Sequence, residues 1–123
     1  MKSLVHAAKT LSDPTRIRVL MALREGELCV CELCDALDVS QSTLSSHLQV
    51  IRKSGLVKTR REGKWMYYAI ADTAQSLLSG IWTHFKASLA KNSRLRGDTI
   101  RLKKRLADRR EGMCCRGFGN SCN

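Results

Sequence analysis

Residues that stop and cap helices divide the first 55 positions into four short helical segments. Ser12-Asp13-Pro14 ends the first segment and caps the second, because proline is tolerated in the first turn of a helix. Glu25-Gly26 ends the second, and a third is expected over residues 28–37. Ser40 is a natural N-cap for a fourth helix, which Gly55 stops. The third and fourth helices, joined by a tight turn, make a helix-turn-helix unit.

Two β-prone runs follow Gly55 and change the period of the sequence. Residues 56–60 and 65–70 are these runs, and Arg61-Glu62-Gly63-Lys64 joins them as a basic hairpin loop. A helix-turn-helix followed by a basic hairpin is a winged helix. We therefore expect a mainly α fold with a small β-hairpin (α+β), in the order ααααββα, forming a DNA-binding and dimerisation domain over residues 1–90.

The helix expected after Asp72-Thr73 carries an apolar stripe wider than a small core can absorb. The simplest use for this stripe is a homodimer interface shared with the first helix. The predicted interface residues are Leu4, Leu77, Leu78, Ile81, Trp82 and Phe85. Packing of this helix only within its own chain is the alternative.

The charge of the chain favours a polyanionic partner. Its 123 residues hold 22 Lys and Arg against 11 Asp and Glu, a formal net charge of +11, which is typical of binding to nucleic acid or to an anionic membrane surface. Much of this basicity lies in residues 91–123, which are predicted to be a partly helical, largely flexible tail that contains cysteines. Since no apolar run is long enough for a membrane span or a secretory signal, a cytoplasmic location without membrane contact is expected.

The start of the fourth helix has the composition of a DNA-reading surface. Small hydroxyl side chains allow close approach to phosphates, and longer polar ones reach base edges in the major groove. The basic hairpin can contact phosphates or the minor groove beside it. The predicted contacts to double-stranded operator DNA are Gln41, Ser42, Thr43, Ser45, Ser46, His47, Arg60, Arg61 and Lys64. A Ser/Thr-rich helix face is also typical of simple solvation, but the neighbouring basic hairpin favours DNA.

Cys29, Cys31 and Cys34 form a C-x-C-x-x-C cluster just before this DNA-reading helix. In a reducing compartment, such thiols are expected to be free, metal-binding or redox-sensing rather than structural disulfides. Three soft sulfurs without a nearby histidine favour a three-coordinate As(III) or Sb(III) over tetrahedral zinc. No constitutive cofactor is expected, and As(III) or Sb(III) is the predicted inducer.

Ideal helix geometry suggests a switch in this cluster. At about 100° per residue, Cys31 and Cys34 share one face, whereas Cys29 and Cys31 lie about 200° apart. Binding of one ion by all three sulfurs would then unwind the start of the third helix. We hypothesise that this distortion tilts the fourth helix and releases DNA.

Four motifs in this order and spacing identify a resemblance to a known family. They are Asp13-Pro14-Thr15-Arg16, Glu27-Leu28-Cys29-Val30-Cys31-Glu32-Leu33, Gln41-Ser42-Thr43-Leu44-Ser45-Ser46-His47-Leu48 and Gly55-Leu56-Val57. Over residues 3–90 the chain resembles the ArsR/SmtB family of winged-helix repressors. This resemblance implies a homodimer whose recognition helices, residues 40–53, enter successive major grooves. It also implies a metalloid-responsive repressor of a resistance operon, with Cys29, Cys31 and Cys34 matching the metalloid box.

The sequence also has a second group of cysteines and lacks the zinc ligands of the zinc-sensing members of this family. Cys114, Cys115 and Cys122 are a second candidate cluster, which the resemblance links to arsenicals, including methylated ones. Zinc-sensing relatives have an Asp-x-His and His-x-x-Glu set. Here Ala74, Phe85 and Ser88 occupy those histidine and glutamate positions, so that zinc site is not expected.

Three other interpretations stay open at this stage. Thiol redox sensing through a Cys31–Cys34 disulfide needs no metalloid, and the cysteines can also be merely small buried hydrophobes. An architectural, constitutive DNA-binding protein would use none of the thiols. Catalysis, such as arsenate reduction, is not expected, because no phosphate-cradling loop or activated nucleophile is present. No residue is predicted to be catalytic.

Overall fold

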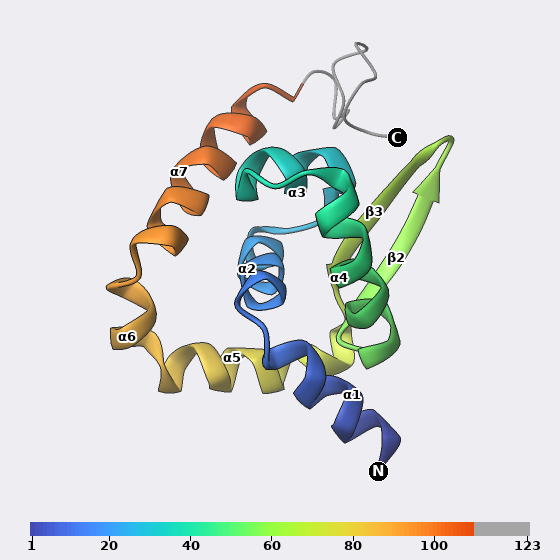
Figure 1. Ribbon diagram of the computed structural model, residues 1–123, viewed down its shortest axis with the longest axis vertical. Coiled ribbons are helices and arrows are strands. Elements are labelled where there is room, and N and C mark those ends of the chain that lie inside the picture. The colour runs from blue at the N-terminus through green and yellow to red at the C-terminus, as the bar shows by residue number, and fades with distance from the viewer. Residues whose placement is uncertain (110–123) are drawn as a thin grey trace.

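The computed structural model describes residues 1–109 and consists of helices arranged around α2, with a small three-stranded sheet at one edge (Figure 1). The α-helices are α1 (Lys2–Leu11), α2 (Pro14–Ala22), α3 (Val30–Leu37), α4 (Gln41–Ser54), α5 (Gln75–His84), α6 (Lys86–Ala90) and α7 (Ser93–Ala107). Single turns η1 (Leu23–Glu25) and η2 (Asp72–Ala74) join them, and the strands are β1 (Leu28–Cys29), β2 (Val57–Glu62) and β3 (Trp65–Ile70). No helix within this part of the chain is long and apolar enough to cross a membrane.

The helix-turn-helix forms at the capping residues that the sequence predicts. Asp13 accepts hydrogen bonds from the backbone N–H groups of Thr15, at 2.8 Å, and Arg16, at 3.1 Å, and Pro14 is the first residue of α2. Ser40 Oγ accepts from the N–H of Thr43 at 3.2 Å, so α4 begins where expected. Gly55 ends α4 with φ of +78°, a left-handed conformation that favours glycine.

The wing is an antiparallel hairpin with one additional strand. β2 pairs with β3 from Val57 opposite Ile70 to Glu62 opposite Trp65, which confirms the predicted hairpin. β1 pairs with the other edge of β3, so the strand order is β1-β3-β2. The sequence predicted a helix from residue 28, but Leu28 and Cys29 are extended and the helix begins only at Val30.

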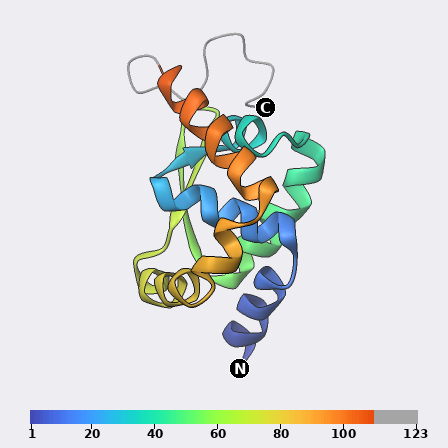
Figure 2. The same cartoon turned by 90° about the vertical axis from the view of Figure 1, so that its left-hand side faces the viewer.

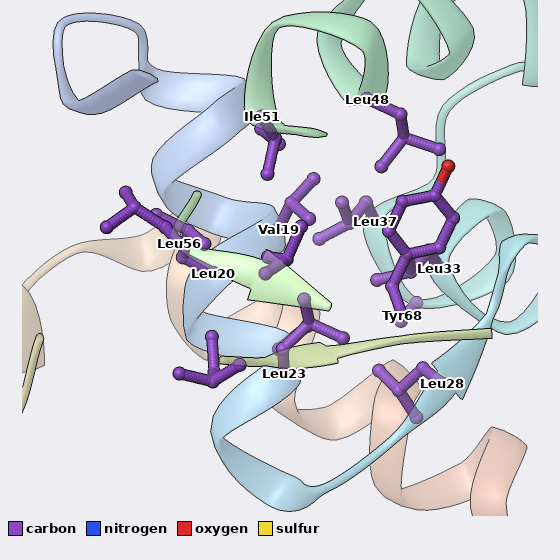
Figure 3. Close-up of a cluster of buried hydrophobic side chains, with 14 of the residues drawn as sticks. Val19, Leu20, Leu23, Leu28, Leu33, Leu37, Leu48, Ile51, Leu56 and Tyr68 are labelled. Atoms are coloured by element: carbon purple, nitrogen blue, oxygen red, sulfur yellow. The ribbon is translucent and has the colours of Figure 1, made fainter. Parts of the chain in front are cut away.

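The core surrounds α2 and joins every part of the DNA-binding unit. Figure 3 shows side chains from α2, α3, α4 and the sheet meeting in one cluster. The members labelled there are Val19, Leu20, Leu23, Leu28, Leu33, Leu37, Leu48, Ile51, Leu56 and Tyr68. Because these apolar faces pack together, α4 and the base of the sheet are held against α3.

The apolar stripe of α5 divides between this core and the surface. Leu78 and Trp82 are buried in the core of the protomer, as expected for packing of this helix within its own chain. Ile81 is partly buried against the same core, whereas Leu4, Leu77 and Phe85 are exposed by 69%, 50% and 50%. The helix also ends at His84, and the separate short helix α6 follows Phe85. The dimer interface stays a prediction.

Helix α7 packs along α3, although its sequence was predicted as part of a mobile tail (Figures 1 and 2). Leu102 enters the core, and Asp98 receives two hydrogen bonds of 2.8 Å from the guanidinium of Arg18 in α2. Residues 93–107 are thus an ordered, packed helix, which corrects the predicted tail over this stretch. The domain boundary at residue 90 stays a prediction, and residues 110–123 lie outside the described part of the chain.

Removal of the Asp13 cap should destabilise the protein measurably. Asp13→Ala leaves two N–H groups of α2 without their acceptor, and we expect the free energy of unfolding to fall by about 1 kcal/mol in urea titrations. Asp13→Asn retains an acceptor oxygen and should lose clearly less. Equal stability of Asp13→Ala and the wild type would contradict this role of the cap.

Candidate thiol site and nucleic-acid interface

Cys29 and Cys31 lie side by side at the start of α3. Cys29 is the N-cap and has extended backbone angles, φ −86° and ψ 168°, while Cys31 lies in the first helical turn. Their Sγ atoms are 3.0 Å apart, and both residues are buried. The expectation that these two sulfurs point away from each other is therefore wrong, because Cys29 precedes the helix and the 100° rotation per residue does not apply to it.

Cys34 belongs to a different environment. It packs in the main core, whereas Cys29 and Cys31 form a separate cluster with Tyr67. Burial and the neighbouring Asp35 carboxylate raise the pKa of the Cys34 thiol. Among residues 1–109, no three Cys, His, Asp or Glu side chains converge as a ready metal site. The arrangement is a pair of close sulfur atoms, with the Cys34 thiol on the next turn of the helix.

Two aromatic side chains of the wing lie beside Cys29 and Cys31, which we call the thiol pair. Cys29 lies opposite Tyr67 in the β1–β3 register, Tyr67 is buried, and Trp65 packs against the same cluster. We call Cys29, Cys31, Trp65 and Tyr67 the thiol–aromatic cluster. It joins α3 to the wing strand β3 independently of the main core.

Glu32 fixes the backbone beside the thiol pair. Its carboxylate accepts from the N–H of Cys29 at 3.1 Å and is fully buried. Arg109 forms a two-pronged ion pair with this carboxylate, one bond measuring 2.7 Å, and donates to the carbonyl of Glu27 at 2.9 Å. Hydrogen bonding to Glu32 raises the pKa of Arg109. A buried carboxylate is tolerated here because a guanidinium neutralises it.

Three arginines at four-residue spacing connect α7 and its end to α3. Arg101 donates to the carbonyl of Ala36 at 2.8 Å, and Arg105 donates to Asp35 at 2.7 Å. The Arg105 guanidinium also lies 3.6 Å from Cys31 Sγ, within the range of a weak hydrogen bond. The sequence-based prediction did not include this row of Arg101, Arg105 and Arg109. Only the spacing of i, i+4 and i+8 could have indicated that the three arginines share a face.

The predicted DNA-reading face of α4 is mostly accessible. Ser42, Thr43, Ser45 and Ser46 are exposed, and Gln41 is partly exposed. His47 differs, because its ring Nδ1 lies 3.2 Å from Arg16 Nη1 and 3.7 Å from Asp13. Its ring is thereby held against α2, with a side-chain exposure of 20%.

The wing basic residues fall into two groups. Arg61 and Lys64 are exposed, as the DNA prediction requires. Arg60 instead bonds to the Glu27 carboxylate at 2.7 and 3.0 Å, pairs with Glu62, and lies 4.4 Å above the centre of the Tyr67 ring. Hydrogen bonding from Arg60 lowers the pKa of Glu27. The second cysteine group, Cys114, Cys115 and Cys122, lies outside the described residues.

This fold and these motifs match known regulators. A family model described as "Bacterial regulatory protein, arsR family" matches residues 13–59. The "Arsenic resistance transcriptional regulator ArsR2" of Pseudomonas putida is 38% identical over 112 residues, covering 87% of this chain and 93% of that protein. The "Arsenical resistance operon repressor" of Escherichia coli K12 is 50% identical over 68 residues, covering 54% of this chain and 58% of that protein. For "ArsR1" of Pseudomonas putida, the match spans 49% of that protein's length.

Solved structures agree with the winged helix-turn-helix architecture. The transcriptional repressor BigR from Xylella fastidiosa is 38% identical with a TM-score of 0.58, covering 67% of this chain and 85% of that one. A homodimeric winged helix-turn-helix DNA-binding domain from Mycobacterium bovis is 27% identical with a TM-score of 0.65, covering 74% and 85%. The molecule is thus a winged helix-turn-helix protein of the regulatory class. It belongs to the arsR family of bacterial regulatory proteins, a family of DNA-binding regulators and not of enzymes.

The Glu32–Arg109 pair should be important for stability. Arg109→Met leaves a buried carboxylate without its cation, and we expect a loss of about 3 kcal/mol in the free energy of unfolding. Lys104→Met, at an exposed position of α7 shortly before Arg109, is the control and should change stability little. Glu32→Leu combined with Arg109→Leu should recover part of the loss. A single Arg109→Met variant as stable as the control would contradict the pairing.

Proposed function

We propose that this protein is a transcriptional repressor that binds operator DNA as a homodimer and is released by a trivalent arsenical. Family membership supports the regulatory role, and the names of its relatives support an arsenic-type inducer. The observation that carries the ligand assignment is the 3.0 Å separation of Cys29 Sγ and Cys31 Sγ beside the helix-turn-helix.

DNA binding is assigned to the accessible face of α4 and the tip of the wing. Gln41 and the hydroxyl side chains of α4 face outward at the N-terminal end of the helix, where base edges and phosphates are within reach. Arg61 and Lys64 supply cationic contacts beside this helix. We assign His47 an indirect role in DNA binding, because Arg16 holds its ring against α2.

The thiol pair is suited to As(III) or Sb(III) in the form of a trivalent hydroxide. Each As–S bond forms when a thiol sulfur replaces a hydroxyl group, and the thiol proton leaves with that hydroxyl as water. The oxidation state of arsenic does not change. Cys29 and Cys31 supply the first two sulfurs, which also suits a methylated arsenical with two replaceable hydroxyls. Cys34 supplies a third after local rearrangement.

Release of DNA requires that the ligand favour the DNA-free form. A coupling free energy of about 1–3 kcal/mol weakens operator binding by about 5–150-fold. The thiol pair is well placed for this, because it contacts α3 and β3, which support the recognition helix and the wing.

Substitution of the thiol pair should abolish the response to arsenite. In fluorescence anisotropy titrations of a labelled operator, Cys29→Ser and Cys31→Ser should bind DNA as the wild type does but fail to be released. Cys34→Ser should retain more of the response, since Cys34 packs apart from the pair.

The same titration separates metalloid binding from redox sensing. Under full reduction, arsenite should release the wild-type protein and peroxide should have no effect. Release by peroxide without reductant, combined with no release by arsenite, would replace the metalloid proposal by a thiol redox switch.

Loss of a cation at the wing tip should reduce the salt dependence of operator binding. The slope of log K against log salt changes by about 0.9 for each phosphate contact, so Arg61→Gln and Lys64→Gln should each lower it by about 1.8 in a homodimer that loses one contact in each protomer. Lys86→Gln on α6, on the opposite side of the molecule in Figure 1, is the matched control and should leave the slope unchanged. Unchanged slopes for both wing variants would contradict the assigned DNA surface.

A further inference from the structure

We infer that the thiol pair controls DNA binding through the wing, and that Glu27, Arg60 and Tyr67 are the coupling residues. This inference rests on the proposed function and specifies how ligand binding reaches the DNA-facing surface. It assigns Arg60 a positioning role in place of the DNA contact that the sequence predicted.

The first link is the backbone pairing of β1 with β3. Cys29 stands opposite Tyr67 in this pairing, and both residues are buried together with Cys31. Close packing of buried side chains opposes the addition of an atom the size of arsenic. Because Tyr67 and β3 lie against the two sulfurs, we expect a ligand there to displace Tyr67 or to shift β1 relative to β3.

The second link is the position of Arg60 on Tyr67. The guanidinium carbon lies 4.4 Å from the ring centre, in the geometry of a cation–π contact. The same guanidinium bonds to Glu27 through Nε at 3.0 Å and Nη2 at 2.7 Å. Arg60 is thus held by a ring that touches the thiol pair and by a carboxylate two residues before Cys29.

The third link is the anchoring of Glu27 itself. Its carbonyl accepts from Arg109, which also pairs with Glu32, and Glu32 in turn accepts from the Cys29 N–H. A shift of β1 therefore moves the Glu27 carboxylate and changes the bidentate pairing with Arg60 in β2. Bidentate pairing fixes direction as well as distance, so β2 must follow or the pair must break.

The contribution of this pair is positional. The side chains of Arg60 and Glu27 are 47% and 37% exposed, and ion pairs exposed to this degree add little to folding stability. Loss of the pair should consequently leave the fold intact while the wing loses its orientation. This separation of effects makes the inference testable.

Glu27→Gln distinguishes coupling from simple electrostatics by the sign of its effect. We call the factor by which arsenite weakens operator binding the release ratio. If the pair orients the wing, Glu27→Gln weakens operator binding without arsenite by about threefold, and its release ratio falls below the 5–150-fold of an intact coupling. If only charge matters, removal of a carboxylate strengthens binding to the DNA polyanion and leaves the ratio unchanged. The second result would overturn the inference. Glu25→Gln, exposed on the neighbouring turn η1, is the matched control for charge.

Arg60→Lys tests the same contact from the other side. Lysine retains the charge but not the bidentate geometry, so the release ratio should again fall. Arg60→Gln should leave the slope of log K against log salt unchanged, whereas the loss of one phosphate contact in each protomer of the dimer would lower it by about 1.8. A lowered slope together with a wild-type release ratio for Arg60→Lys would overturn the inference. Should Glu27→Gln fail to fold, as judged by circular dichroism, Arg60→Lys decides the outcome.

Failure of this inference is distinguishable from failure of the proposed function. When the wild type is not released by arsenite, the proposed function fails and the coupling falls with it. When the wild type is released and both Glu27→Gln and Arg60→Lys retain the full release ratio, only the coupling through the wing is contradicted.

Discussion

The pairing of Leu28 and Cys29 with Tyr68 and Tyr67 is the interaction on which the site depends. It holds Cys29 in an extended conformation ahead of α3, and this places its sulfur next to that of Cys31. The same pairing brings the wing strand against the thiols. Without it, the helix would extend toward residue 28 and the two sulfurs would lie on opposite faces.

Ion pairs from α7 and from Arg109, just after it, hold this arrangement from the other side. Arg105 bonds to Asp35 in α3. Arg109 neutralises the buried Glu32 carboxylate, which accepts a hydrogen bond from the Cys29 N–H. The thiol pair thus lies between the wing and α7, and α3 is constrained along both sides. A ligand at this position acts on several elements that meet there, which is the requirement for coupling to DNA.

The sequence predicted those features whose causes are local. Asp13-Pro14, Ser40 and Gly55 determine helix ends through their own backbone and side-chain chemistry, and each prediction is confirmed. The hairpin followed from β-prone runs around a glycine-bearing turn.

The features that the sequence did not predict depend on distant partners. A two-residue strand at Leu28–Cys29 has no periodicity of its own, and its partner lies about 40 residues away in the sequence. Helix α7 is strongly basic, and it packs through arginine–carboxylate pairs in addition to Leu102. Because its composition is that of a basic, solvent-exposed segment, the sequence predicted a tail at this position. The burial of Leu78 and Trp82 similarly depended on where α5 meets the core.

Hydrogen–deuterium exchange of the reduced protein, with and without arsenite, tests the central claim most directly. If the thiol pair and the wing respond as one unit, arsenite should change exchange at the amides of Cys29 and of β2 and β3, while α5 stays unchanged. Cys29→Ser should show no such change. Altered exchange confined to α4, with the β1–β3 pairing unaffected, would contradict the account.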